Sequence, residues 1–188
     1  DFCLSRGLGD VYKRQDKKYT TQDAKDYLLN IFGGFDSQLH DMVERAFDEA
    51  WIDFYPRDGK VGGAFDCGVP SARQSRVLTN FDGAFGDIVT LAHELGHAVH
   101  SYRSNRDQPT VYRDYVIFVA EVASTCNEAL LMEHLLQSTQ DRRRRAWLLN
   151  HFLEQFKGTL YRQTMFAEFE LRIGQLTAQG ETLTADLL

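Results

Sequence analysis

The chain has 188 residues, of which 43% are hydrophobic and 26% charged, and its net charge is -6. This composition is ordinary for a globular protein with a substantial core. The acidic balance, without a basic stripe interleaved with aromatic residues, argues against a nucleic-acid-binding protein. No apolar stretch reaches the ~20 residues of a membrane span, and no signal-peptide pattern is recognised. We therefore expect a cytoplasmic location without a membrane partner.

The first residues differ in character from the rest of the chain. Residues 10–15 read like the translation of a transposon adapter used in sequencing libraries. We therefore treat residues 1–15 as a non-native segment, as one would treat an expression scar. Residues 16–188 are interpreted as a fragment of a longer protein.

Apolar residues at helical spacing predict two packed helices after residue 20. Thr20 or Thr21 can cap the first helix, which a Gly-Gly pair at residues 33–34 ends. Asp36 can cap the second helix. Nothing in these two helices indicates a functional site.

The apolar period then changes to that of short strands. We predict strands at residues 52–55, 61–65 and 77–81, which form a small antiparallel sheet in an otherwise helical (α+β) chain. Gly62 and Gly63 loosen the second strand. Glycine in an edge strand can mark the approach of another backbone, such as an extended peptide that adds to the sheet. A flexible hairpin is the alternative, and spacing alone does not separate the two.

A helix expected over residues 85–103 carries the sequence His-Glu-Leu-Gly-His at residues 93–97. Residues four apart lie on one face of a helix, so His93 and His97 can direct two imidazoles at one zinc ion. Glu94 lies one step round the helix, where it could act on water as a general base without binding the metal. The alternative is a pair of core histidines with ordinary hydrogen-bond partners. The apolar surroundings favour a metal, because unpaired polar groups in a core are costly.

A catalytic zinc ion takes three protein ligands, so two histidines leave the site one ligand short. The metzincin pattern would need a histidine at position 103, which is Arg103. His100 lies one turn too far along the helix to reach the same ion, and we interpret it as a packing or supporting residue. The third ligand should therefore come from a neighbouring helix.

Glu121 is the candidate for that third ligand. It is a carboxylate in the middle of a second strongly apolar helix, expected from about residue 115. An unpaired ion there would be costly, and Gly96 would let the returning helix come close. A buried salt bridge is the alternative role for Glu121. Glu128, further along the same face, could orient one of the ligand histidines.

With these residues in place, the chain resembles the oligoendopeptidase F branch of the thimet oligopeptidase family of zinc metallopeptidases. The resemblance rests on residues 90–97 (Thr-Leu-Ala-His-Glu-Leu-Gly-His) and 118–125 (Phe-Val-Ala-Glu-Val-Ala-Ser-Thr), and it extends over nearly everything after residue 15. It implies a zincin-like, mostly helical catalytic core and a zinc endopeptidase that admits oligopeptides through a deep channel. Residues 16–188 would then be a fragment of the catalytic domain.

The resemblance also implies roles for individual residues. It assigns one zinc ion to His93, His97 and Glu121, and the general base to Glu94. It assigns the binding of the substrate main chain to the strand near Gly63, Ala64 and Phe65. The family stabilises the reaction intermediate with a histidine and tyrosines of a later segment, which we place beyond residue 188, so this fragment is expected to be weakly active or inactive. The alternative is a non-catalytic helical fragment that binds metal or peptide without hydrolysis.

Overall fold

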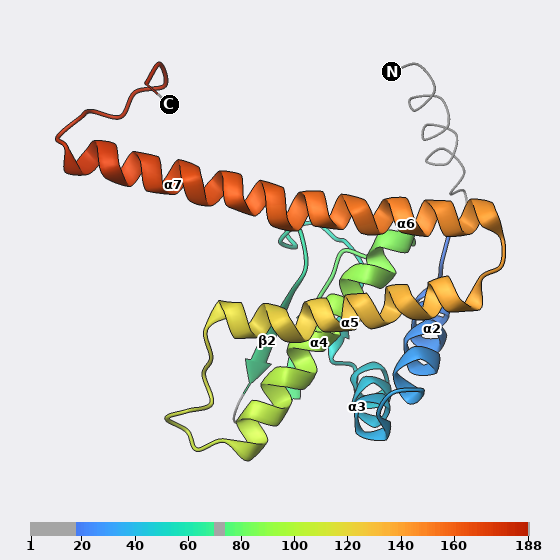
Figure 1. Ribbon diagram of the computed structural model, residues 1–188. Coiled ribbons are helices and arrows are strands. Elements are labelled where there is room, and N and C mark those ends of the chain that lie inside the picture. Colours follow the sequence, from blue (N-terminus) through green and yellow to red (C-terminus); the bar gives the residue numbers. More distant parts are fainter. Residues whose placement is uncertain (1–17, 70–73, 188) are drawn as a thin grey trace. The chain divides into compact units, whose positions relative to one another are not determined.

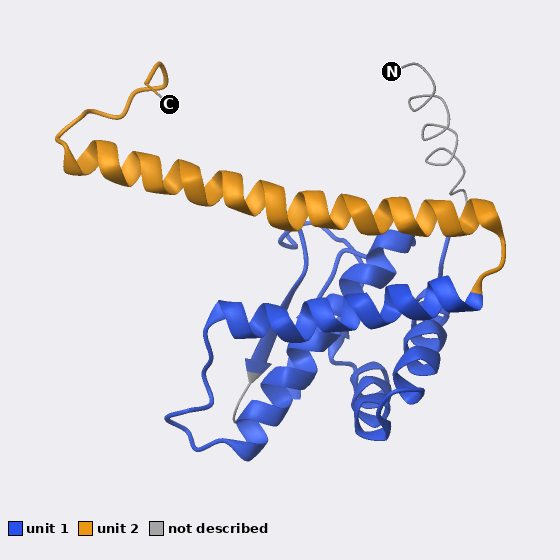
Figure 2. Ribbon diagram, viewed as in Figure 1, with its two compact units in different colours: residues 1–138 blue, residues 139–188 orange. Residues whose placement is uncertain are grey.

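The computed structural model describes residues 18–69 and 74–187 (Figure 1). The segment interpreted as non-native, residues 1–15, lies outside the described residues. The chain divides into two compact units, one up to Ser138 and one from Thr139 onward, which Figure 2 colours blue and orange. The predicted site residues all belong to the first unit.

The first unit opens with the two predicted helices, α2 (Thr21–Gly33) and α3 (Ser37–Asp48). Thr20 caps α2, because its hydroxyl accepts a hydrogen bond from the N–H of Asp23 while the Asp23 carboxylate accepts one from the N–H of Thr20 at 2.7 Å. The Asp36 carboxylate accepts a hydrogen bond from the N–H of Gln38 at 2.8 Å and caps α3. Both predicted helix starts are therefore confirmed.

A three-stranded sheet follows, made of β1 (Ile52–Asp53), β2 (Phe65–Val69) and β3 (Gln74–Leu78) in the order β1-β3-β2. β2 and β3 are antiparallel, as predicted, but β1 pairs with β3 in parallel, so the sheet is mixed. β2 therefore runs antiparallel to β1 without pairing with it, and β3 lies between the two. Consequently β2 is an edge strand of the sheet.

The second strand begins later than the sequence pattern predicts. Residues 61–64 form a loop, and β2 starts only at Phe65. Gly63 has a φ of 85°, which is not an extended conformation. The side-chain amide of Asn80 donates hydrogen bonds to the carbonyl oxygens of Val61 and Gly63, at 3.0 and 2.9 Å. The side chain of Asn80 therefore holds this loop, in place of the backbone hydrogen bonds between strands that a longer β2 would make.

Two long helices complete the first unit, α4 (Phe85–Asp107) and α5 (Ile117–Ser138). α4 begins at Phe85 because the carboxylate of Asp87 accepts hydrogen bonds from three preceding backbone N–H groups, between 2.8 and 3.0 Å. These N–H groups belong to residues 82–84, so the carboxylate fixes the backbone that leads into the helix. α4 extends slightly beyond its predicted end.

α4 and α5 pack directly against each other at Gly96, as the sequence predicted. A Cβ atom on Gly96 would lie 2.7 Å from Cα of Ser124 and 2.9 Å from the carbonyl oxygen of Ala123. At the same place the side-chain amide of Asn127 donates to the carbonyl oxygen of Ala92 at 3.3 Å. Only a residue without a side chain permits this approach of two backbones.

The core of the first unit gathers apolar side chains from α2, α3, the sheet, α4 and α5. Its largest fully buried members are Trp51, Phe32, Leu28, Ile31, Ile88, Leu91, Leu95, Leu131, Leu135, Val43 and Val77. The first turns of α5, which the sequence pattern assigned to a core, are exposed in this chain, with Ile117 at 73% and Phe118 at 77%. Apolar composition predicted burial there, but in the described chain the buried side chains of α5 begin at Ala120, and the helix packs mainly on α4 and also contacts α2.

The second unit is helical from α6 (Arg142–Phe156) to α7 (Arg162–Ala178). Gly158 lies in a π-helical turn, η2 (Lys157–Tyr161), which joins α6 and α7 into a continuous rod in Figure 1. A π turn widens the helix by one residue without ending it. Among the described residues, none of the helices combines the length and apolarity needed to cross a membrane.

Candidate metal centre

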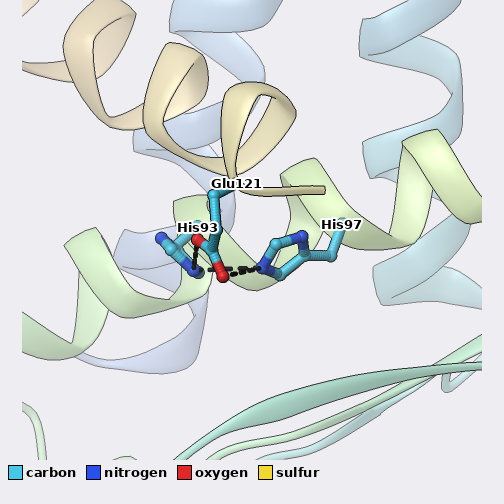
Figure 3. A group of neighbouring side chains, drawn as sticks. All are labelled: His93, His97 and Glu121. Atoms are coloured by element: carbon cyan, nitrogen blue, oxygen red, sulfur yellow. Dashed lines mark hydrogen bonds and ion pairs between the residues drawn. The ribbon is translucent and has the colours of Figure 1, made fainter. Parts of the chain in front are cut away.

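His93, His97 and Glu121 lie together where α4 meets α5 (Figure 3). The Nε2 atoms of the two histidines are 3.1 Å apart. One carboxylate oxygen of Glu121 is 3.4 Å from Nε2 of His93, and the other is 3.8 Å from Nε2 of His97. The helical spacing of the two histidines and the close approach at Gly96 thus bring all three side chains to one point.

These three side chains fit a zinc ion by chemistry and by spacing. Imidazole nitrogens and a carboxylate oxygen are the donors of catalytic zinc sites. Two donors that bind one tetrahedral zinc ion at 2.0–2.1 Å lie about 3.3 Å from each other. The observed separations of 3.1, 3.4 and 3.8 Å are close to that value. Glu121 remains 45% exposed, which leaves one side of the group open.

The other ring nitrogen of His93 has its own acidic partner. Its Nδ1 lies 2.5 Å from a carboxylate oxygen of Glu128, on the next turns of α5. Burial lowers the pKa of His93, but the hydrogen bond and charge of Glu128, together with the charges of Glu94 and Glu121, raise the pKa above its usual value. A carboxylate behind the ring fixes its orientation and tautomer, as in the metal sites of other proteins. The sequence pattern singled out Glu128 for this contact.

His97 has a backbone partner that the sequence did not reveal. The backbone of Ala120, the residue before Glu121, lies near the His97 ring and acts to raise its pKa. Burial and the neighbouring His93 lower the pKa of His97, which favours the neutral imidazole that a metal needs. A carbonyl carries no residue-specific signal, so only the packing of α5 on α4 could have identified it.

Glu94 points into the protein beside this group and is only 6% exposed. Burial raises the pKa of Glu94 to about 7, and the charges of Asp66 and Glu121 act in the same direction. His93 and a hydrogen bond from the backbone N–H of Asp66 oppose the rise. A carboxylate whose pKa lies near neutrality can both take and return a proton.

His100 does not join the group of His93, His97 and Glu121. Its ring stacks on the ring of Tyr115, with centroids 4.0 Å apart. Its Nδ1 atom is buried and has no hydrogen-bond partner among the described residues. The position agrees with the packing role that its place on the helix suggested.

Of the predicted substrate-binding residues, Gly63 and Ala64 lie in the loop just before the edge strand β2, and Phe65 is the first residue of that strand. A Cβ atom on Gly63 would meet nothing within 4 Å, so this part of the loop faces open space. Side chains hold the loop in place. The ammonium group of Lys60 donates to the carbonyl oxygens of Asp53 and Tyr55, and the amide of Asn80 donates to those of Val61 and Gly63. The side chain of Phe65 is 44% exposed.

A mostly helical fold with this group of side chains on its central helix pair defines the class of zincin-like helical metallopeptidases. The chain belongs to peptidase family M3, whose sequence model matches residues 11–188. It is 43% identical to the oligopeptidase PepF of Bacillus subtilis and 42% identical to the chromosomal oligoendopeptidase F of Lactococcus lactis subsp. cremoris. Each of these alignments covers 95% of the chain, but only 26% and 30% of the two relatives.

The fold is also similar to that of a solved structure. A crystal structure from Chlamydophila abortus, described as a peptidase, superimposes with a TM-score of 0.75 and 34% sequence identity. The superposition covers 96% of this chain and 32% of that one. The chain thus spans about a quarter to a third of these three proteins.

Proposed function

We propose that residues 16–188 form the metal-binding part of a zinc-dependent endopeptidase that cleaves internal peptide bonds of oligopeptides. In this proposal His93, His97 and Glu121 hold one zinc ion. The observation that carries it is the convergence of these three donors from two helices, beside a buried glutamate. Membership of peptidase family M3 and the oligoendopeptidase F relatives support the same reaction.

Glu94 is the proposed general base. A bound zinc ion would supply a Lewis acid, which polarises a carbonyl oxygen and lowers the pKa of water. Glu94 would take a proton from the attacking water and return it to the leaving amine. Its pKa near neutrality supports both steps. Glu128 would keep Nδ1 of His93 occupied, so that Nε2 faces the ion.

The edge strand β2 is the proposed binding place for the substrate main chain. An extended peptide could add to this edge through backbone hydrogen bonds. The open space at Gly63, just before β2, and the approach of the Asp66 backbone in β2 to Glu94 support this choice. A peptide bound there would run past the base, and Gly63, Ala64 and Phe65 would contact it first.

The activity of the chain by itself is proposed to be weak or absent. An oxyanion-stabilising donor typically contributes a factor of about 100 to 1,000 in rate. The histidine and tyrosines that supply it in the resembling family have no counterpart that we assign here. A cytoplasmic location also stays a prediction.

The test compares Glu94→Gln with wild type in the full-length protein that contains this chain. Wild type should bind zinc and cleave a quenched fluorescent oligopeptide, and the variant should keep the zinc and lose the cleavage. Glu133→Gln makes the same change at an exposed position of α5 and should retain activity. A wild-type protein that holds zinc but cleaves no peptide would favour the non-catalytic alternative, and one without zinc would reject the metal site.

A further inference from the structure

Asp66, on the edge strand β2, is an acidic side chain that the proposed reaction does not use. Its carboxylate accepts hydrogen bonds from the hydroxyl of Ser75 on β3 and, at 3.0 Å, from the hydroxyl of Ser101 on α4. The Ser101 oxygen is in turn 2.7 Å from the hydroxyl of Tyr115, just before α5. One carboxylate therefore links two strands, the metal-binding helix and the approach to the second helix.

The hydrogen bonds in this group run in one direction. A serine hydroxyl has a single proton, so Ser101 can donate to only one neighbour at a time. Because the carboxylate of Asp66 can only accept, Ser101 donates to it and accepts from Tyr115. Each polar atom then has a partner, which a half-buried carboxylate needs.

The backbone of the same residue reaches the proposed base. β2 packs on α4, and the backbone N–H of Asp66 approaches the carboxylate of Glu94 closely enough to lower its pKa. Glu94 and Ser101 are seven residues apart, two turns along one face of α4. Gly68 follows this face as well, since a Cβ atom there would lie 3.2 Å from Cβ of Ser101. β2 thus lies along α4. The side chain of Asp66 is bound to Ser101 at one turn of the helix, and its backbone approaches Glu94 two turns earlier.

We infer that Asp66 is a positioning residue, whose carboxylate fixes β2 on α4 so that its own N–H holds the carboxylate of Glu94 in place. The inference rests on the proposed function, in which Glu94 is the base. Without the anchor, β2 keeps its pairing with β3 but loses its hydrogen bond to α4. The Glu94 carboxylate then loses a fixed donor at the position from which it must act.

The test uses Asp66→Ala and Ser101→Ala, separately and together, in the full-length zinc-loaded protein. Bound zinc, kcat and KM for a fluorescent oligopeptide are measured for each variant. Because small displacements of a reacting group can cost up to about 100-fold, we expect kcat per bound zinc to fall about tenfold or more in each single variant. The double variant should fall no further than the singles, within about twofold, because both remove one anchor.

Two further variants separate positioning from stability. Asp66→Asn can accept from Ser75 and donate to Ser101, so it should restore kcat to within about threefold of wild type. Ser104→Ala removes another serine hydrogen bond of α4, to the carbonyl oxygen of Arg113, without touching β2. It should leave kcat per bound zinc unchanged even where the melting temperature falls.

The inference is overturned where Asp66→Ala and Ser101→Ala keep the kcat per bound zinc of wild type. It is equally overturned where Ser104→Ala loses as much as they do, since the loss then reflects general destabilisation. A zinc-loaded wild type that cleaves no peptide rejects the proposed function, and the positioning role with it. Active wild type with unaffected variants rejects the positioning role alone.

Discussion

Gly96→Ala tests whether the close contact between α4 and α5 builds the metal centre. The new methyl group would lie 2.7 Å from Cα of Ser124, 2.9 Å from the carbonyl oxygen of Ala123 and 3.1 Å from the amide nitrogen of Asn127. Carbon atoms in van der Waals contact lie about 3.5–4.0 Å apart, so the helices must separate by roughly 0.8 Å. Two of the three obstructing atoms belong to the backbone and cannot turn aside.

The size of the effect follows from two opposing terms. Overpacking of a core costs about 1–3 kcal/mol, and the rigid surroundings here favour the upper end. The better helix propensity of alanine returns about 1 kcal/mol. Glu121 is one turn from Ser124 and moves away from the histidines with it. The net cost of about 2 kcal/mol therefore weakens the binding of zinc. That energy corresponds to about 30-fold weaker zinc binding.

The assay is a zinc titration of the full-length protein against a competing chelator, accompanied by thermal unfolding. Gly86→Ala provides the matched control, because Gly86 lies in the same helix and a Cβ atom there meets nothing within 4 Å. We expect the control to keep wild-type zinc affinity and to unfold at the same or a higher temperature. Equal zinc affinity in Gly96→Ala and Gly86→Ala would refute the role of the helix contact.

Three other outcomes follow from the same structure. Glu128→Gln should weaken zinc binding by about 10–100-fold in a chelator titration, because the ring of His93 loses its carboxylate partner; unchanged affinity would remove Glu128 from the site. Asn80→Ala removes two hydrogen bonds worth about 0.5–1.5 kcal/mol each and should raise the KM for peptides by about threefold or more at constant zinc content. An unchanged KM would argue against substrate binding at the loop of Gly63. Removal of zinc by a chelator should lower the melting temperature, because a ligand at 100 times its Kd stabilises by about 2.7 kcal/mol; a melting temperature indifferent to zinc would contradict tight binding to the folded protein.

The parts of the structure that the sequence predicted correctly depend on local chemistry. The capping residues Thr20 and Asp36 act on their own helices, and the i, i+4 spacing of His93 and His97 fixes their common face. Gly96 is a different case, because a glycine inside a core helix costs stability and so indicated a neighbouring backbone. The structure places α5 at that point.

The parts that the sequence did not predict depend on contacts between distant segments. The roles of the Ala120 carbonyl and the Asp66 side chain depend on the atomic contacts of α5 and β2 with α4, which the sequence does not predict. The start of β2 was missed because Asn80, far along the chain, holds residues 61–64 out of the strand. The exposed first turns of α5 show that an apolar pattern reports the tendency to be buried, but not the presence of a partner.

The most direct test of the metal centre is the zinc content of the full-length protein and of its His97→Ala and Glu121→Ala variants, measured by elemental analysis after dialysis against zinc-free buffer. A site formed by two histidines and a glutamate predicts about one zinc ion per wild-type chain and a large loss in each variant, because each removes one of three protein ligands. Wild type without zinc, or a Glu121→Ala variant that retains all of it, would contradict the assignment.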